Sequence, residues 1–433
     1  RIRIEKRNAT TGAKITSFGT PGIASSNPSN KIDALNAIAT DGTYFYAVGY
    51  DSQLGTADQQ WRLEKRQNDT GQLVSPFPTS PNADGDGIIS YDDSGTGNDH
   101  ANGIALEGIY VYAVGTESDM SASGGAGWRI ERYDIAAGTT GFSPALTDTT
   151  DLDLSAGDDA ATAIAVNSNN LYVVGQNGTT QQWEIQSRIL AGTLDTGFNT
   201  AGTTAGRLPL SEFTAVPTIP ATPYAVVVDG TDLYVGGTQN EGTDASWVIV
   251  KRNATNGTAD GTFGNSDGLI SVDPGSNNDE LRAIAVDATL FTSAGVIFAA
   301  GMDASVTSGQ WHIRAFNTTD GAIHTEALGG ATWSEDLSNG ADRIHDIILD
   351  GGYLYVVGST EEGTANAGWV VAKINATTGA YDTNFGTNGI VKTITAGTAD
   401  SAWAIVSDTT GIITGGQIGD SSNYHWRFER RNK

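Results

Sequence analysis

An aspartate precedes nearly every copy of one apolar strand pattern in this sequence. It stands four residues before the core position of the strand in six of seven copies, and alanine replaces it in the fourth copy. The positions are Asp33, Asp99, Asp159, Ala221, Asp279, Asp342 and Asp400. Carboxylates gathered at one rim of a channel would bind Ca²⁺ or another hard cation. Aspartate before a strand also caps a turn by accepting backbone N–H bonds, and a repeated fold needs that cap in every copy, which favours the structural role.

A second oxygen-rich segment, residues 82–93, matches the spacing of an EF-hand-type calcium loop. It has oxygen-bearing side chains at loop positions 1, 3, 5 and 12, glycine at position 6 and an aliphatic residue at position 8. It departs from the pattern in asparagine at position 1, in aspartate at position 12 and in the lack of flanking helices. The predicted ligands are Asn82, Asp84, Asp86, Ser90 and Asp93. Ca²⁺ binding and a plain acidic surface turn remain alternatives here.

Seven N-x-[ST] sequons would accept glycans if the protein is exported. They begin at Asn8, Asn68, Asn177, Asn253, Asn256, Asn317 and Asn375. Five of them fall at the same hairpin of the repeat, where asparagine also suits the turn.

No motif for catalysis is found, and we predict that the protein is not an enzyme. The five histidines lack metal-ligand spacing, and the nucleophile elbow, the P-loop and the dinucleotide-binding motif are all missing. His100 and His345 fall on the first strand of a repeat, where a side chain can face a channel or serve as an ordinary polar position. There is no cysteine, so thiol chemistry and disulfides are excluded.

A repeat of about 60 residues must position these side chains. Each copy contains one tryptophan at the head of a W-x-I-x-x-R variant: Trp61, Trp128, Trp183, Trp247, Trp311, Trp369 and Trp426. Each copy also reads as four short strands rich in Val, Ile and Tyr, and its second strand ends in glycine. No segment keeps a helical period. We therefore predict an all-β, seven-bladed β-propeller of four-stranded antiparallel blades, with the tryptophans packed between blades.

The repeat resembles a known family. The pattern A-I-A-x-D-G-x-L-Y-V-V-G, then W-x-I-x-K-R-N and F-G-x-x-G-[IL], is matched best at residues 229–269 and 350–390. It resembles the delta-60-type repeat of bacterial and archaeal secreted and cell-surface β-propellers. The resemblance covers the whole chain, although the second, third and fifth copies have lost part of the Phe-Gly element. It implies a propeller outside the cytoplasm and transfers no catalytic residue.

The repeat count leaves one strand over. A single propeller is expected over residues 1–433, with repeats at about 31–98, 99–157, 158–220, 221–277, 278–340, 341–398 and 399–433. Residues 1–8 are an eighth copy of the tryptophan strand, with Ile2 in the tryptophan slot, so residues 1–30 supply strands for ring closure or for a neighbouring copy. The strands predicted to self-assemble contain Ile2 and Ile4 at one end of the chain and Trp426 and Phe428 at the other.

The net charge and hydropathy of the chain limit the classes of partner that it can bind. With 24 basic and 50 acidic residues, the formal net charge of -26 excludes nucleic acid, and no apolar run is long enough to span a membrane. We predict a non-catalytic extracellular or cell-surface propeller, structural or adhesive, that self-assembles by terminal strand exchange into a layer or filament. The alternatives are a calcium-dependent propeller that binds glycans, peptides or other surface proteins, and a lyase or lactonase with a metal at the channel mouth.

Overall fold

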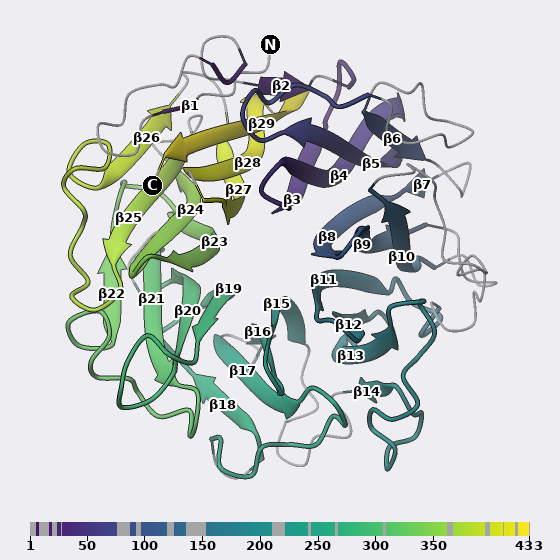
Figure 1. The fold of residues 1–433 in the computed structure, drawn as a ribbon, viewed down its shortest axis with the longest axis vertical. Helices are drawn as coiled ribbons and strands as arrows, with labels where there is room; N and C mark the ends of the chain where they lie inside the picture. Colours follow the sequence, from purple (N-terminus) through teal and green to yellow (C-terminus); the bar gives the residue numbers. More distant parts are fainter. Residues whose placement is uncertain are drawn as a thin grey trace.

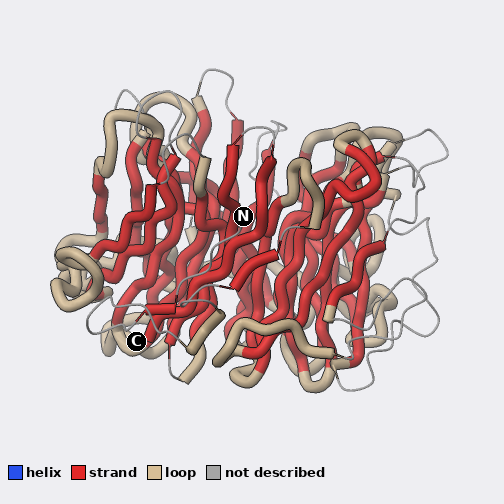
Figure 2. Tube along the Cα trace, turned by 90° about the horizontal axis from the view of Figure 1, so that it is seen from above, coloured by secondary structure: helices blue, strands red, loops and turns tan. Residues whose placement is uncertain are grey.

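The computed structural model shows strands and loops arranged in a ring about a central axis (Figures 1 and 2). It describes residues 6–7, 17–19, 24–26, 28–75, 87–91, 97–118, 125–135, 153–209, 221–240, 244–264, 267–305, 309–361, 367–394, 399–409, 411–420 and 423–432. These residues contain no helix, and hence none that could cross a membrane. The prediction of an all-β propeller is confirmed.

Three strands of each repeat run outward from the axis in chain order (Figure 1). The innermost strands are β3 (Ala34–Thr40), β8 (His100–Glu107), β11 (Ala160–Val166), β15 (Ala221–Asp229), β19 (Glu280–Asp287), β23 (Arg343–Asp350) and β27 (Ser401–Ser407). The second strands are β4 (Tyr44–Gly55), β9 (Tyr110–Glu117), β12 (Asn170–Asn177), β16 (Asp232–Asn240), β20 (Val296–Asp303), β24 (Tyr353–Glu361) and β28 (Gly411–Asp420). The third strands are β5 (Asp58–Gln67), β10 (Gly127–Asp134), β13 (Gln182–Ile189), β17 (Ala245–Asn253), β21 (Gln310–Asn317), β25 (Ala367–Asn375) and β29 (Asn423–Asn432).

A fourth, outermost antiparallel strand completes six of these sheets. These strands are β6 (Ile88–Tyr91), β14 (Arg207–Pro209), β18 (Leu269–Val272), β22 (Thr332–Glu335), β26 (Ile390–Ile394) and, beside β29, the N-terminal β2 (Ala24–Ser26). The expectation of seven four-stranded blades is corrected to six, because β8, β9 and β10 form a sheet of three described strands. This second repeat is one that has lost part of the Phe-Gly element preceding the outer strand elsewhere.

Two further short strands depart from the antiparallel plan. β7 (Gly97–Asn98) pairs in parallel with β5, and β1 (Lys6–Arg7) pairs in parallel with β29. β1 is the described part of the surplus copy of the tryptophan strand.

The tryptophans of the repeat pack between blades, as predicted. Six of the seven are at most 1 % exposed: Trp61, Trp128, Trp183, Trp247, Trp311 and Trp369. The indole of Trp311 lies against the backbone of Gly358 in the next blade, and Trp369 lies against Gly416 in the same way. A large ring on one blade therefore fits the space left by a missing side chain on its neighbour. The seventh, Trp426, lies in β29, where the structure describes the backbone.

The ring closes through residues before the first repeat. β2 pairs with β29 in the register Ala24 to Phe428 and Ser26 to Trp426. Phe18 is fully buried in the cluster that joins β3 and β4 to β27 and β28. The N-terminal segment thus supplies the fourth strand of the last blade and part of the core shared by the last and first blades.

Candidate functional site

Each innermost strand carries one extra residue relative to its partner strand, and a glycine lies opposite the irregularity. A methyl group on any of these glycines would overlap a carbonyl oxygen of the innermost strand. The glycines are Gly49, Gly115, Gly175, Gly237, Gly301, Gly358 and Gly416. Bulges of this kind re-aim side chains, often near functional sites.

The seven extra residues all line one cavity of about 280 Å³ on the propeller axis. They are Asn36, Asn102, Thr162, Tyr224, Arg282, His345 and Trp403. Each stands three positions after the strand-leading aspartate, or after Ala221 in the fourth copy. The sequence signal for this set is a position that varies from copy to copy inside an otherwise regular strand, and no motif marks it. We call this set the channel ring.

One part of the channel ring binds neighbouring blades together. Asn36 Nδ2 donates to the carbonyl oxygen of Ala101 at 2.9 Å, and Asn102 Nδ2 donates to that of Ala161 at 2.9 Å. Thr162 Oγ1 continues the series by donating to the carbonyl oxygen of Pro223 at 2.7 Å. Four consecutive blades are therefore linked by three side-chain hydrogen bonds at the channel wall.

The remaining four members of the ring are large and planar. The guanidinium of Arg282 lies over the ring of Tyr224, 4.2 Å from its centroid. The rings of His345 and Trp403 are stacked at 3.9 Å between centroids. His345 Nε2 lies 3.2 Å from Ser359 Oγ, whereas His345 Nδ1 and Trp403 Nε1 are buried without a protein partner. This wall combines flat surfaces with unsatisfied polar atoms.

Charges on this wall are compensated or suppressed. Arg282 Nε and Nη2 donate to Glu280 Oε2 at 3.1 and 2.8 Å. Burial, together with the nearby positive charges of Arg282 and Arg343, lowers the pKa of His345 to about 3, so the imidazole is neutral at physiological pH.

Asp346 is the one acidic residue in a ring of small ones. The equivalent positions in the other blades are Ala37, Gly103, Ala163, Ala225, Ala283 and Ala404. Its Oδ2 accepts a hydrogen bond from the backbone N–H of Ile405 at 2.8 Å, and Oδ1 accepts one from Ile347 at 2.8 Å. Burial raises the pKa of the carboxyl to about 7.

This raised pKa predicts a pH-dependent cost. Folding favours the protonated form of Asp346, so its contribution to stability is full below the ordinary pKa of 3.8 and is lost as the pH rises through about 7. An Asp346→Asn variant should therefore gain stability relative to the wild type by at least about 1 kcal/mol between pH 4 and pH 8. Urea unfolding of both proteins across this range measures the difference. A difference that stays constant with pH would contradict the assignment.

The strand-leading aspartates serve as caps and lie away from the channel cavity. All six are fully buried. Asp33, Asp159 and Asp279 connect the loop before the innermost strand with the segment that follows the second strand. Asp159, for example, accepts backbone N–H bonds from Leu154 and Gly178 at 2.6 and 2.7 Å, and Asp279 accepts them from Gly275 and Ala304 at 2.9 and 2.6 Å. Burial raises the pKa of Asp279 to about 6. Among the described residues, no three His, Cys, Asp or Glu side chains are grouped so that they could hold a metal ion.

The calcium-loop prediction rests mostly on residues outside the described part of the chain, namely Asn82, Asp84, Asp86 and Asp93. The fifth predicted ligand, Ser90, lies in β6. Its hydroxyl donates to Asp51 Oδ2 at 3.0 Å and accepts from Arg62 Nη1 at 3.2 Å. Ser90 is thus engaged inside the first blade.

The sequons differ in their surroundings. Asn68 is 2 % exposed, and its Nδ2 donates to Thr40 Oγ1 and to Asp408 Oδ2, so a glycan on this amide would break a bridge between the first and last blades. Asn177, Asn253, Asn317 and Asn375 are half-buried, Asn256 is exposed, and Asn8 lies outside the described residues. Asn253 and Asn375 each accept backbone N–H bonds of the following turn through Oδ1, which confirms the turn role.

The two histidines predicted as candidates for the channel lie in different places. His345 belongs to the channel ring. His100 stacks on Tyr50 at 4.2 Å, and its Nε2 lies 2.6 Å from Gln59 Oε1. Burial lowers the pKa of His100 to about 4.

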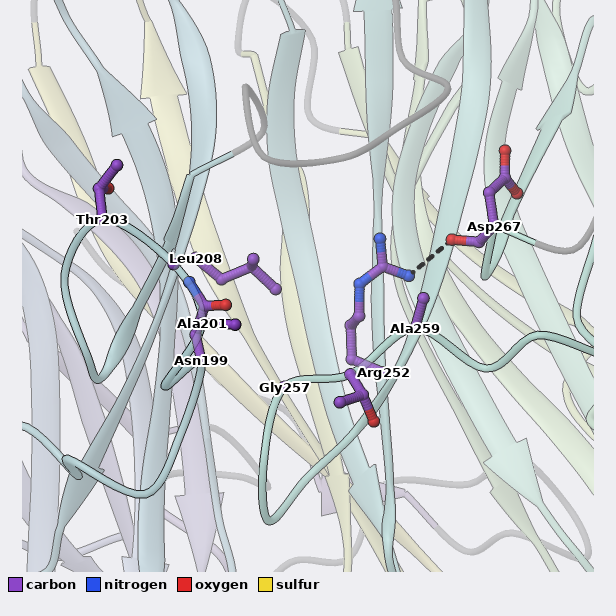
Figure 3. Close-up of a pocket in the computed structure, with 10 residues that line it drawn as sticks. Asn199, Ala201, Thr203, Leu208, Arg252, Gly257, Ala259 and Asp267 are labelled. Carbon is purple, nitrogen blue, oxygen red and sulfur yellow. Dashed lines mark hydrogen bonds between the residues drawn. The ribbon is translucent and has the colours of Figure 1, made fainter.

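A second hollow, of about 480 Å³, lies between loops of the third and fourth repeats (Figure 3). Asn199, Thr203 and Leu208 lie on one side of it, and Arg252 and Asp267 lie on the other. Arg252 Nη1 donates to the backbone carbonyl oxygens of Asp267 and Gly268, both at 3.1 Å. The guanidinium holds the loop of its own blade, which gives this hollow a structural role.

Fold and geometry together define a β-propeller with a built channel. No family model and no curated protein matches the sequence. Among solved structures, the chain is similar to an ulvan lyase of polysaccharide lyase family PL25, at 12 % identity and a TM-score of 0.53 over 95 % of this chain and 96 % of that one. It is also similar to Drosophila Plexin A in complex with Semaphorin 1b, at 8 % identity and a TM-score of 0.49 over 96 % of this chain and 88 % of that one. Chaetomium thermophilum Sqt1 matches at 13 % identity and a TM-score of 0.45, over 94 % of this chain and 100 % of that one. Likeness at such identities concerns the fold alone.

Proposed function

We propose that this protein is a non-catalytic extracellular propeller, structural or adhesive, that self-assembles through its terminal strands into a surface layer or filament. The observation that supports the proposal is the outer edge of β29. It pairs with β2 along residues 426–428 and with β1 along residues 430–431. One edge therefore accommodates a strand beyond the one that closes the ring.

β2 is fixed from two sides and leaves no closing role for β1. It pairs with β29 in the last blade, and two arginines of the first blade donate to it. Arg62 Nη2 donates to Ser26 Oγ at 3.1 Å, and Arg66 Nη2 donates to the carbonyl oxygen of Ser25 at 3.3 Å. Both arginines are buried.

β1 is held within its own chain by a short pairing. Its described backbone register joins Lys6 to Arg430 and Arg7 to Arg431. A strand of high β propensity that pairs over so short a stretch is suited to the sheet edge of another molecule.

The charge of the whole chain favours another copy as that partner. Eight of the 24 basic residues stand in the terminal segments: Arg1, Arg3, Lys6, Arg7, Arg427, Arg430, Arg431 and Lys433. The chain as a whole carries a formal charge of -26. A basic end of one copy is thus attracted to the acidic body of the next. Such a contact joins two different surfaces, and contacts of this type build open filaments unless the rotation closes a ring.

Removal of residues 1–8 tests the proposal. The full-length chain should form oligomers that electron microscopy and light scattering detect, and the truncated chain should remain monomeric with an unchanged thermal unfolding midpoint. High salt should weaken the assembly, because the attraction is between exposed charges.

A paired substitution separates strand pairing from a general effect of the terminus. Ile2→Asn/Ile4→Asn removes the apolar alternation of residues 1–8, while Thr11→Asn/Ala13→Asn changes the same number of residues further along the chain. Only the first pair should abolish assembly. The proposal would be contradicted if the truncated protein formed polymers of equal length. It would also be contradicted if the full-length chain stayed monomeric at all concentrations.

Only the architecture is shared with the ulvan lyase, so the lyase or lactonase alternative has no observation of its own. Binding of a ligand in the channel is a separate matter.

A further inference from the structure

The channel cavity is built asymmetrically around an otherwise repeated ring. Asn36, Asn102 and Thr162 donate side-chain hydrogen bonds to backbone carbonyl oxygens of the next blade. In the following four blades the same position holds Tyr224, Arg282, His345 and Trp403, which instead form two stacked pairs. Inter-blade packing does not require this change, because both solutions occur in one molecule. Packing of the fold therefore does not explain why these four positions hold large planar side chains.

The chemistry of this wall excludes most ligand classes. An anionic ligand would need an uncompensated cation, but Arg282 is paired with Glu280 and His345 is neutral. A cationic ligand would meet the guanidinium of Arg282, which already covers Tyr224. What remains is a neutral ligand with flat, weakly polar faces and many hydroxyl groups. Aromatic rings that provide a flat apolar surface with a polar edge are suited to it.

A further pocket, distinct from the hollow beside Arg252, adjoins the channel cavity. It has a volume of about 310 Å³ and shares Tyr224 with the channel. Its other polar lining residues are Gln176, Thr222, Thr238, Asn240, Asn278 and Glu280. Amides, hydroxyls and a carboxylate supply both donors and acceptors, as the hydroxyls of a sugar require. Ligand pockets commonly measure about 300–1,000 Å³, so two adjoining hollows of this size suit a short chain of sugar residues better than a single large ligand.

We propose that the channel and this adjoining pocket bind a neutral oligosaccharide. Trp403 and Tyr224 supply the flat surfaces. Trp403 Nε1 and His345 Nδ1 are buried, so the polar contacts to the ligand come from the side chains that line the adjoining pocket. No metal takes part. The site does not include the terminal strands, so the binding proposal is tested separately from the proposal of self-assembly.

Binding is tested with the full-length protein on an array that contains neutral gluco-, manno-, galacto- and xylo-oligosaccharides, uronate oligosaccharides and amino-sugar oligosaccharides. Calorimetry then gives the Kd of the best neutral probe. We expect binding to a neutral probe that persists in EDTA. Failure of every neutral probe to bind, stronger binding of uronates or amino sugars, or loss of binding in EDTA would overturn the proposal.

Two variants locate the site. Trp403→Ala and Tyr224→Ala should each weaken binding at least tenfold. Both residues are half-buried, and the second variant keeps the test decisive if the first folds poorly. Trp333→Ala is the matched control, because Trp333 lies on the outermost strand β22, packed against Tyr381 with ring centroids 5.6 Å apart. It should bind like the wild type. Unchanged affinity in both channel variants would place the ligand elsewhere and overturn the assignment.

Discussion

Replacing Trp311 by alanine should lower the free energy of unfolding by about 3–5 kcal/mol, the range found when a fully buried large aromatic side chain is truncated. Trp311 is 0 % exposed and belongs to the cluster that joins the fifth and sixth repeats. Its Nε1 donates to the carbonyl oxygen of Ser359 across the blade boundary at 3.3 Å. The substitution removes apolar contact between blades and leaves that carbonyl oxygen without its donor. Urea unfolding followed by circular dichroism measures the loss.

Trp333→Ala is the appropriate comparison, because it deletes the same side chain from a half-buried position on β22. It should cost clearly less, because Trp333 is only partly buried against that cluster, so its truncation removes less apolar surface from contact. Equal losses in the two variants would contradict the view that stability depends on the tryptophans between blades. That view explains why tryptophan recurs at one point of the repeat.

The tryptophan period allowed the architecture to be predicted, because each repeat must bury the same face against its neighbour. Ring closure was harder to predict. Residues 1–8 and the last tryptophan strand are copies of one sequence, and both suit the slot beside β28. In the structure β29 takes this slot. β1 is left on the outer edge of β29, next to β2. Sequence similarity does not distinguish two equivalent strands, whereas the pairing of each with its neighbours does.

The candidate site lay beyond motif reasoning for a physical reason. The polar residues that recur in the sequence are the strand-leading aspartates, and these are buried caps, as their turn chemistry favoured. The channel ring instead occupies the one position that differs in nearly every copy, from Asn36 to Trp403. A regular strand would alternate its side chains between the two faces of the blade, and only the bulge turns this position toward the axis. The signal for the bulge was the glycine that recurs in each second strand. The sequence placed it at the end of the strand, whereas in the structure each second strand continues beyond it.

That glycine carries the second large prediction. Gly358→Ala should cost about 3 kcal/mol, as overpacking of a close-packed core does. The added methyl group would overlap the carbonyl oxygen of Arg343 and come close to the indole of Trp311. The bulge that presents His345 to the channel must open to make room. Gly351→Ala is the control: Gly351 has φ +59°, and an added Cβ would meet no atom within 4 Å. It should lose only about 1 kcal/mol, from left-handed backbone strain.

Combining Gly358→Ala with Trp311→Ala distinguishes the two sources of crowding. The cavity left by Trp311 relieves the contact with the indole, so the double variant should be more stable than the sum of the two losses predicts. Relief should be partial, because the carbonyl oxygen of Arg343 belongs to the bulge and is not removed. Full additivity in urea unfolding would mean that the indole does not limit the glycine position. Complete relief would mean that the bulge does not limit the glycine position. The channel ring could then form without a glycine opposite the bulge.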